Sequence, residues 1–378
     1  MKRIEKFHPG TYRNQGDFRS FVPAFVNDDW TWDNSQLNHL LADANKELGA
    51  LNAYSELVPD IDTYIRMHIR VEANKSNRIE GTNTTIEEDM MPIEDVDPER
   101  RDDTLEVNNY IKAMNYGIHR ITEDEFPFTS RFMREMHAIL LNGVRGQHKT
   151  PGEFRTSQNF IGGSMPSNAR YVPPSIIDMP DLVSDLDKFI NREDDLPTLI
   201  KIAIIHYQFE TIHPFLDGNG RIGRLIIPLF LLYTHELTKP CFYISDYFEQ
   251  NRTQYYDTLQ NVRVKGDMLE WIIFFLQASI QTAKSAKYKF RRAVQQVEEY
   301  KNYLITKRSG TDSLRLIFDA LYKNPVSNVP ILSGETGLSV PTVNSAVKTL
   351  VQDDILWELT GNRRNRVFAL HSYISVFR

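Results

Sequence analysis

The chain has little of what would place a protein in an oxidising compartment or a membrane. It contains one cysteine, Cys241, so no disulfide can form within its 378 residues, and we expect a buried, inert thiol. The longest apolar stretch, 225–233, is about half of the ~20 residues that a bilayer-spanning helix needs. Residues 1–10 are charged and lack the apolar segment of a signal peptide. We therefore expect a cytoplasmic protein that does not associate with membranes.

Charge is distributed unevenly along the chain, although the net charge is only −6. From residue 282 onward there are 15 Lys and Arg against eight Asp and Glu, whereas the preceding residues carry 29 against 42. A basic quarter that follows an acidic body indicates a separate module, one suited to contact with a polyanion.

Hydrophobic spacing predicts a mainly α-helical fold. Residues 1–32 show no periodicity and are expected to form an extended arm, while Gly and Pro in 144–175 predict a long ordered loop or hairpin. The predicted helices of the body are 33–56, 61–80, 105–116, 129–141, 180–191, 197–212, 221–235, 250–262, 267–281 and 282–307.

The C-terminal segment has a different pattern. Helices are expected at 312–323, from about Pro330 and at 341–353, followed by strands at 355–359 and 367–370. Two helices joined by a glycine turn and followed by a hairpin are typical of a winged helix-turn-helix.

Residues 213–224 concentrate titratable and flexible groups in the sequence His-Pro-Phe-Leu-Asp-Gly-Asn-Gly-Arg-Ile-Gly-Arg. Pro214 ends the preceding helix, so His213 faces a loop, and an ordinary imidazole pKa near ~6.5 suits a general base. Gly218, Asn219 and Gly220 allow a backbone that aims N–H groups at one point. We expect an anion nest that opens onto a helix N-terminus.

Two cations and one carboxylate complete this segment. Arg221 and Arg224 fall on one face of the next helix's first turn, where positive charge opposes the helix dipole unless an anion binds. Asp217 beside a phosphate site suits Mg²⁺, which keeps most of its waters and takes one or two protein oxygens. Each feature alone is usually structural. Together they predict a phosphate-binding site with a base beside it.

The pattern His-Pro-Phe-x-x-Gly-Asn-Gly-Arg-x-x-Arg resembles the signature of Fic domain proteins, and every fixed position is present in 213–224. Residues 151–155, 160–163 and 171–174 are similar to the flap of that family, and Asn251 with Tyr255-Tyr256 resembles its nucleotide-pocket segment. The resemblance covers about residues 60–280, and a C-terminal winged helix is a common attachment. For the flap region, a plain ordered surface loop is the alternative.

The resemblance implies protein adenylylation, in which AMP passes from ATP to a Ser, Thr or Tyr hydroxyl of a target protein. His213 would be the base, Asp217 would hold Mg²⁺ between the α- and β-phosphates, and the arginines would bind the β- and γ-phosphates. The nest amides and Asn219 would stabilise charge on the α-phosphate. The flap residues Phe160, Ile161, Gly162 and Gly163 would hold the target segment by strand addition. The implied ATP-binding residues are Glu80, His213, Gly218, Asn219, Gly220, Arg221, Ile222, Gly223, Arg224, Asn251 and Tyr256.

A second motif, Ser76-Asn-Arg-Ile-Glu80-Gly81, ends the predicted helix 61–80. Ser76 and Glu80 share one helical face, and in isolation the motif is typical of a surface helix end. Fic proteins often carry an inhibitory helix with Ser/Thr-x-x-x-Glu-Gly/Asn. The resemblance therefore implies that Glu80 pairs with Arg224 and that ATP then binds unproductively. Ser76, Glu80 and Gly81 are the inhibitory candidates, and a role of Glu80 in AMP removal stays open.

The C-terminal module leaves two interpretations. Lys348 on the expected recognition helix and Arg363, Arg364 and Arg366 on the expected wing are candidates for contact with DNA phosphates. The acidic pair Asp353-Asp354 ends the recognition helix and repels phosphate. The alternative is a degenerate winged helix used for protein contacts, homodimer formation included.

The predicted function is an autoinhibited protein adenylyltransferase whose partners are ATP, Mg²⁺ and a hydroxyl-bearing target protein. One alternative is a DNA-binding regulator whose Fic pocket only senses nucleotide. Another is the same enzyme with a different donor such as UTP, because the predicted site recognises phosphates and not the base. The expected domains are an N-terminal arm with the inhibitory helix (1–103), a Fic core (104–281), a linker helix (282–310) and a winged helix-turn-helix (311–378).

Overall fold

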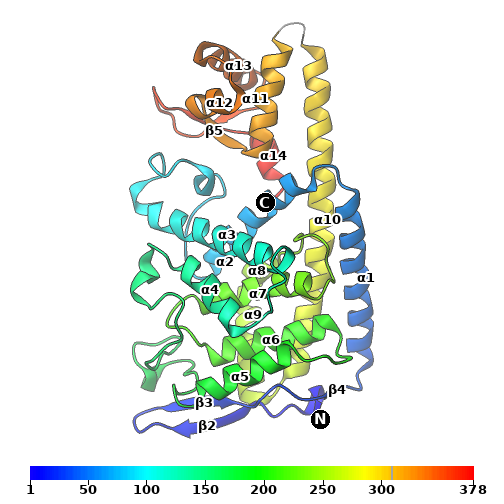
Figure 1. Cartoon of the computed structure of the whole chain (residues 1–378), viewed down its shortest axis with the longest axis vertical. Helices are drawn as coiled ribbons and strands as arrows, with labels where there is room; N and C mark the ends of the chain where they lie inside the picture. The colour runs from blue at the N-terminus through cyan, green and yellow to red at the C-terminus, as the bar shows by residue number, and fades with distance from the viewer. Residues whose placement is uncertain (308–309) are drawn as a thin grey trace.

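The computed structural model describes residues 1–307 and 310–378 and is mainly helical, as predicted (Figure 1). The body's helices are α1 (Ser35–Leu57), α2 (Ile61–Ile79), α3 (Arg101–Thr122), α4 (Ser130–Leu140), α5 (Met179–Ile190), α6 (Thr198–Ile212), α7 (Asn219–Tyr233), α8 (Ser245–Gln250), α9 (Arg252–Lys265) and α10 (Met268–Thr306). Short 3₁₀ turns lie at Ile4–Lys6, Glu88–Met90, Pro98–Arg100, Arg145–His148 and Pro166–Asn168. No helix in these two ranges is long and apolar enough to cross a membrane.

Helix α6 runs through the centre of the body. Every residue from Leu199 to Ile212 is buried, and α5, α7 and α10 pack around it. A helix that is buried on all sides is apolar on all sides, and the sequence Ile-Ala-Ile-Ile at 202–205 meets this requirement. The loop between α6 and α7 is therefore held by two rigid, buried helices.

One continuous helix replaces two predicted ones. The segments 267–281 and 282–307 form the single 39-residue helix α10, which runs beside α1 along the molecule (Figure 1). The prediction of a break was wrong because no Gly or Pro occurs between Met268 and Thr306 to end the helix. The expected boundary at 281–282 thus falls inside a helix, and residues 308–309 of the expected linker lie outside the described residues.

The N-terminal arm contains strands that the sequence did not predict. Strands β2 (Gly10–Asn14) and β3 (Arg19–Pro23) form an antiparallel hairpin, and β1 (Lys2–Arg3) pairs in parallel with β4 (Trp30–Thr31). The backbone N–H of Phe21 donates to the carbonyl of Val172 at 2.9 Å. The hairpin is thereby attached to the end of the long loop 144–175.

The C-terminal segment is a winged helix, as predicted. Its elements are α11 (Thr311–Lys323), β5 (Val326–Asn328), α12 (Val329–Thr336), α13 (Val340–Gln352), β6 (Trp357–Glu358), β7 (Val367–Ala369) and α14 (His371–Ser375), with strand order β5-β7-β6. The three-residue strand β5 was not predicted, because so short a run has no readable alternation. The rings of Tyr322 and Phe377 lie 5.8 Å from Tyr64 and 5.2 Å from His68, respectively. The winged helix therefore rests on the first half of α2, the helix that leads to Glu80.

Candidate active site

The loop between α6 and α7 is built from two left-handed residues. His213 ends α6 with φ +51°, and Gly218 precedes α7 with φ +74°. Asn219, the first residue of α7, reaches back into the loop. Its side chain accepts from the N–H of Phe215 and donates to the carbonyl of Phe215, both at 2.8 Å. Asn219 is 2% exposed, so its amide clamps the loop. These two bonds leave one N–H of the amide unused, so the contact of this side chain with the α-phosphate stays a prediction.

The predicted nest is instead the first turn of a helix. Only Gly218 of the three residues 218–220 has positive φ, because α7 begins at Asn219, two residues earlier than predicted. The amides that face the site are therefore those of a helix N-terminus, which favours anions. A Cβ atom at Gly220 would lie 2.3 Å from Oε1 of Glu80. Glycine at 220 leaves room for a carboxylate at this N-terminus, where a phosphate would also fit.

Arg224 is held by the helix end that carries the Ser76–Glu80 motif. Its Nη2 lies 2.5 Å from Oε1 of Glu80 and donates to the carbonyl of Ser76 at 2.9 Å, while its Nε donates to Oγ of Ser76 at 2.8 Å. The guanidinium is 1% exposed and the Glu80 side chain is 34% exposed. Burial raises the pKa of Glu80, but the charge and the hydrogen bond of Arg224, together with the charges of Arg221 and His213, outweigh this and hold the pKa below its usual value. The ion pair expected between Glu80 and Arg224 is present.

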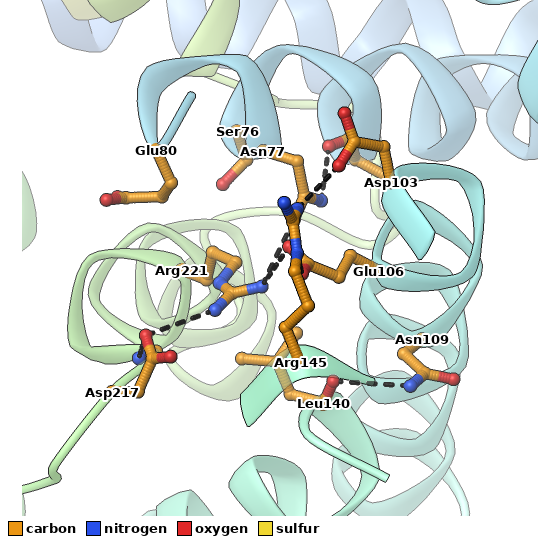
Figure 2. A network of polar contacts seen from close by, with 12 residues as sticks. Ser76, Asn77, Glu80, Asp103, Glu106, Asn109, Leu140, Arg145, Asp217 and Arg221 are labelled. Atoms are coloured by element: carbon orange, nitrogen blue, oxygen red, sulfur yellow. Dashed lines mark hydrogen bonds and ion pairs between the residues drawn. The ribbon is translucent and has the colours of Figure 1, made fainter. Parts of the chain in front are cut away.

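Arg221 has a different carboxylate partner, which the sequence did not reveal. Its Nη1 lies 3.0 Å from Oε2 of Glu106 on α3, and its Nη2 lies 3.4 Å from Oδ1 of Asp217 (Figure 2). Arg221 therefore has anionic partners even without ATP, which the sequence did not predict. A buried guanidinium without a partner is costly, and helices α2 and α3 supply one carboxylate to each.

His213 has the surroundings of a base that stays neutral at physiological pH. Its Nδ1 lies 3.4 Å from the carbonyl of Glu210, which can only accept, so the proton resides on Nδ1 and Nε2 keeps its lone pair. Burial, together with the nearby positive charge of Arg263, lowers the pKa of His213 to about 4. The imidazole can therefore accept a proton over the whole neutral range.

Asp217 lies at the edge of the site with a half-exposed carboxylate. Its Oδ1 accepts from the N–H of Gly218 at 2.6 Å, and its side chain is 44% exposed. Within the part of the chain that the structure describes, no group of three His, Cys, Asp or Glu is placed to hold a metal. A lone carboxylate fits Mg²⁺ that is held mainly by water and substrate phosphates.

The long loop 144–175 is tied directly to the His213 turn. The carbonyl of His213 accepts from Nε of Arg155 at 3.0 Å and from Nδ2 of Asn159 at 3.3 Å. Nη2 of Arg155 also donates to the carbonyl of Pro174 at 2.5 Å, so one buried guanidinium joins the middle of the loop and its C-terminal end to the His213 turn. Sequence inspection gave Arg155 no role of its own.

The predicted flap has fewer paired residues than a regular hairpin. Residues Ile161 and Tyr171 form a single antiparallel bridge with N–H···O distances of 2.8 and 3.1 Å. Phe160 and Ile161 are each 36% exposed, and Gly162 and Gly163 have positive φ. Two consecutive left-handed residues end the ladder after one bridge. The N–H and the carbonyl of Ile161 are both used in this bridge.

The remaining predicted nucleotide contacts are partly turned away from the site. Ile222 is fully buried in the core, so only its backbone faces the loop. A Cβ at Gly223 would lie 2.2 Å from Oε1 of Glu210, so this glycine makes room for a buried carboxylate. The side chain of Asn251 donates to the carbonyl of Tyr247 at 2.9 Å. Burial and the Glu80 charge raise the pKa of Tyr256 to about 12, which places its phenol near the Glu80–Arg224 pair.

The wing carries the predicted basic residues on an exposed surface. A cavity of about 700 Å³ is lined by Lys348, Arg363, Arg364 and Arg366 together with apolar residues of α12 and α13. Arg366 is paired with Glu358 at 2.5 Å. The Asp353 carboxylate, which was expected to repel phosphate, lies 2.6 Å from Nζ of Lys307. Its negative charge is therefore offset within the protein.

Comparisons with known proteins agree with this geometry. A model of the Fic/DOC family matches residues 127–231, the model of the family's N-terminal region matches 38–119, and a winged helix-turn-helix DNA-binding model matches 311–356. The fold and site thus define a Fic-type core with an attached winged helix. Residues 127–231 thus match the Fic/DOC family, and residues 38–119 match its N-terminal region.

Two curated relatives carry the name protein adenylyltransferase Fic. The one from Drosophila grimshawi is 29% identical over 212 residues, which cover 54% of this chain and 40% of the relative. The one from Culex quinquefasciatus is 30% identical over 190 residues, covering 50% and 35%, respectively. The similarity therefore spans less than half of the length of either relative.

Solved structures share the fold at low identity. A Fic family protein from Desulfovibrio desulfuricans G20 superposes with a TM-score of 0.55 and 20% identity over 89% of this chain and 96% of that chain. A Fic domain containing signaling protein from Bacteroides thetaiotaomicron gives 0.52 and 19% over 68% and 97%. The first of these alignments extends over most of both chains, so the likeness is not confined to the core.

Proposed function

We propose that this protein is an autoinhibited adenylyltransferase that transfers AMP from ATP to a hydroxyl side chain of a target protein. The observation that carries the proposal is the convergence of three features on one loop: the neutral base His213, the N-terminus of α7, and Arg224 held by Glu80. The names of the curated relatives support the same reaction.

In the proposed reaction, Nε2 of His213 accepts the hydroxyl proton of the target. The resulting oxygen forms a bond to the α-phosphorus, the bond from that phosphorus to the bridging oxygen breaks, and pyrophosphate leaves. The amides of Gly218, Asn219 and Gly220 face the negative charge of the α-phosphate, because they form the start of α7. Mg²⁺ would be bound through Asp217 and would offset phosphate charge.

The remaining assignments follow from position. Arg221 and Arg224 would bind the β- and γ-phosphates, and Tyr256 would border the nucleotide near Arg224. The flap residues Phe160, Ile161, Gly162 and Gly163 would hold a strand of the target through the backbone groups that the Ile161–Tyr171 bridge leaves unused. Because these contacts recognise phosphates, the preferred base is a matter for experiment. We keep the cytoplasm as the proposed location, because a single cysteine, Cys241, suits a reducing compartment.

Autoinhibition is proposed because Glu80 occupies the position of an anionic ligand. Its carboxylate lies against Gly220 at the N-terminus of α7 and on Arg224 at the same time. ATP would need both places, the α7 N-terminus for its α-phosphate and Arg224 for its γ-phosphate. ATP then binds without its full set of phosphate contacts, and the α-phosphorus is not aligned for attack.

Mass spectrometry of the purified protein with ATP and Mg²⁺ tests the reaction. We expect the Glu80→Gly variant to gain the mass of one AMP on itself or on a protein from a lysate, and the Glu80→Gly/His213→Ala double variant to gain none. A Glu80→Gly protein that is folded and binds ATP, yet transfers no nucleotide from ATP or UTP, would contradict the proposal.

A second function, DNA binding, is favoured by the wing. Arg363 and Arg364 are exposed on the wing and Lys348 on α13, and all three line one cavity. We expect duplex DNA to bind with an affinity that falls steeply with salt and that is weakened by Arg363→Ala/Arg364→Ala. Absence of binding at low salt would leave protein contact, homodimer formation included, as the function of this domain.

A further inference from the structure

Glu106 is a buried carboxylate shared by two guanidinium groups. Its Oε2 lies 3.0 Å from Nη1 of Arg221, and its Oε1 accepts from Nε of Arg145 at 2.8 Å (Figure 2). The Glu106 side chain is 8% exposed. Arg145 reaches further to Asp103, which lies one turn earlier on the same helix. One carboxylate thus fixes a phosphate-site arginine and the start of the long loop 144–175.

Helix α3, which carries Glu106, is fixed in the core of the body. Glu106 lies inside the 22-residue helix α3, which packs on α2, α4 and α7. Within α3 the neighbouring residues Val107 and Tyr110 are fully buried. Withdrawing this carboxylate would require moving a core helix, so Glu106 must remain beside Arg221 when nucleotide is bound.

One partner of Glu106, Arg221, and the residue that follows its other partner both border the proposed metal carboxylate. Nη2 of Arg221 lies 3.4 Å from Oδ1 of Asp217. Gly146, the neighbour of Arg145, is so close that a Cβ atom there would lie 3.3 Å from Oδ2 of Asp217. Because Glu106 holds Nη1, the Arg221 guanidinium stays at the long end of ion-pair distance from Asp217.

We propose that Glu106 is a positioning residue that keeps Asp217 available to Mg²⁺ by retaining Arg221. This inference rests on the proposed function. Without the Glu106 charge, Asp217 is the nearest remaining anion to Arg221, and the two would close into a tight pair. Arg221 and Mg²⁺ would then compete for the same carboxylate. Glu106 thereby lets a cation and a metal-binding carboxylate occupy neighbouring positions without neutralising each other.

Nucleotide binding tests the inference without relying on turnover. Binding of a fluorescent ATP analogue is titrated with Mg²⁺ in Glu80→Gly and in Glu80→Gly/Glu106→Gln. We expect the second variant to need at least about tenfold more Mg²⁺ for half-maximal tight binding, while binding without Mg²⁺ changes by less than about threefold, because one tenfold step corresponds to one lost charge-assisted contact. In the transfer assay we expect the same shift in Mg²⁺ dependence and a lower kcat.

Two matched variants distinguish a positioning role of Glu106 from a general effect of its replacement on folding. Asp103→Asn removes the outer partner of Arg145 and leaves Glu106 intact, and we expect its Mg²⁺ dependence to equal that of Glu80→Gly. Glu106→Asp keeps the charge on a shorter side chain, so it should fold and give an intermediate shift. An unchanged Mg²⁺ requirement in both Glu106 variants, or higher activity of Glu106→Gln in the otherwise wild-type chain, overturns the inference. Loss of transfer by Glu80→Gly alone contradicts the proposed function instead, because Glu106 is intact there.

Discussion

Two arginines of one helical turn are each paired with a carboxylate, yet the two pairs differ in what can move. The Glu80–Arg224 pair spans 2.5 Å and the Glu106–Arg221 pair 3.0 Å, and both guanidinium groups are buried. Glu80, however, is the last residue before Gly81 at a helix end, with a side chain that is 34% exposed. Glu106 lies in mid-helix and its side chain is 8% exposed.

The presence of opposite charges therefore does not by itself define the role of an ion pair. Gly81 has φ +103° and open space around it, and the Glu80 side chain is 34% exposed, so we expect that this carboxylate can turn away from Arg224. In the proposed function ATP would then replace Glu80 at Arg224, whereas at Arg221 it would bind in addition to Glu106. We interpret the first pair as a removable block and the second as part of the active arrangement.

A third carboxylate, that of Glu210, lies near Arg224. Glu210 is 8% exposed, and its Oε1 has no hydrogen-bond partner within the described part of the chain. Burial raises the pKa of Glu210 to about 7, although the Arg224 charge acts in the opposite direction. Arg224 is paired with Glu80, so the carboxylate of Glu210 is buried in this site without an ion pair to offset its desolvation.

The largest expected effect comes from neutralising this unpaired carboxylate. A carboxyl group whose pKa is raised on folding contributes most stability below its unfolded pKa near ~4.5 and loses it as the pH rises through about 7. Glu210→Gln should therefore match the wild type near pH 4.5 and exceed its unfolding free energy by about 3 kcal/mol at pH 8. Urea unfolding at several pH values measures this difference. A pH-independent difference would show that Glu210 is paired after all.

The next effect tests the removable block. Charge-assisted hydrogen bonds contribute about 1.5–3 kcal/mol, and ATP must break the one between Glu80 and Arg224 to bind productively. Glu80→Gly should therefore raise the rate of AMP transfer about 10- to 100-fold over wild type. Glu80→Gln, which keeps the shape without the charge, should give a smaller rise. Equal rates for wild type and Glu80→Gly would place Glu80 with Glu106, as a residue of the active arrangement.

Much of this site could be predicted from the sequence, because most of its residues lie close to one another along the chain. The motif 213–224 positions a base, a helix N-terminus and two arginines through a turn and 3.6-residue spacing, and the Ser76–Glu80 motif was recognisable by resemblance. The structural role of Asn219 was missed, because a sequence does not show that a side chain clamps its own loop through Phe215.

The parts that could not be predicted are long-range. Glu106 reaches Arg221 across 115 residues, and nothing in the acidic stretch around it distinguishes this glutamate from its neighbours on the surface. Predicting α3 to begin at 105 rather than at Arg101 also hid that Asp103 and Glu106 share one helical face toward Arg145. Arg155 had a readable signal: an arginine in a loop beside Pro and Gly, with no acidic neighbour except Glu153 to pair with. The wing and α11–α13 were predictable because each element had its own cap or turn, whereas β5 depends on pairing with β7.

The smallest effect concerns Ser76, which holds Arg224 from the same helix as Glu80. Its Oγ accepts from Nε of Arg224 at 2.8 Å and its carbonyl accepts from Nη2, so Ser76→Ala removes one of the contacts and leaves the carbonyl. A single such hydrogen bond contributes about 1 kcal/mol, which corresponds to about a fivefold change in transfer rate. If Ser76 belongs to the block, Ser76→Ala raises the rate, by less than Glu80→Gly does. If the rate falls instead, Ser76 orients Arg224 for the γ-phosphate, and the removable part of the block is the Glu80 carboxylate alone.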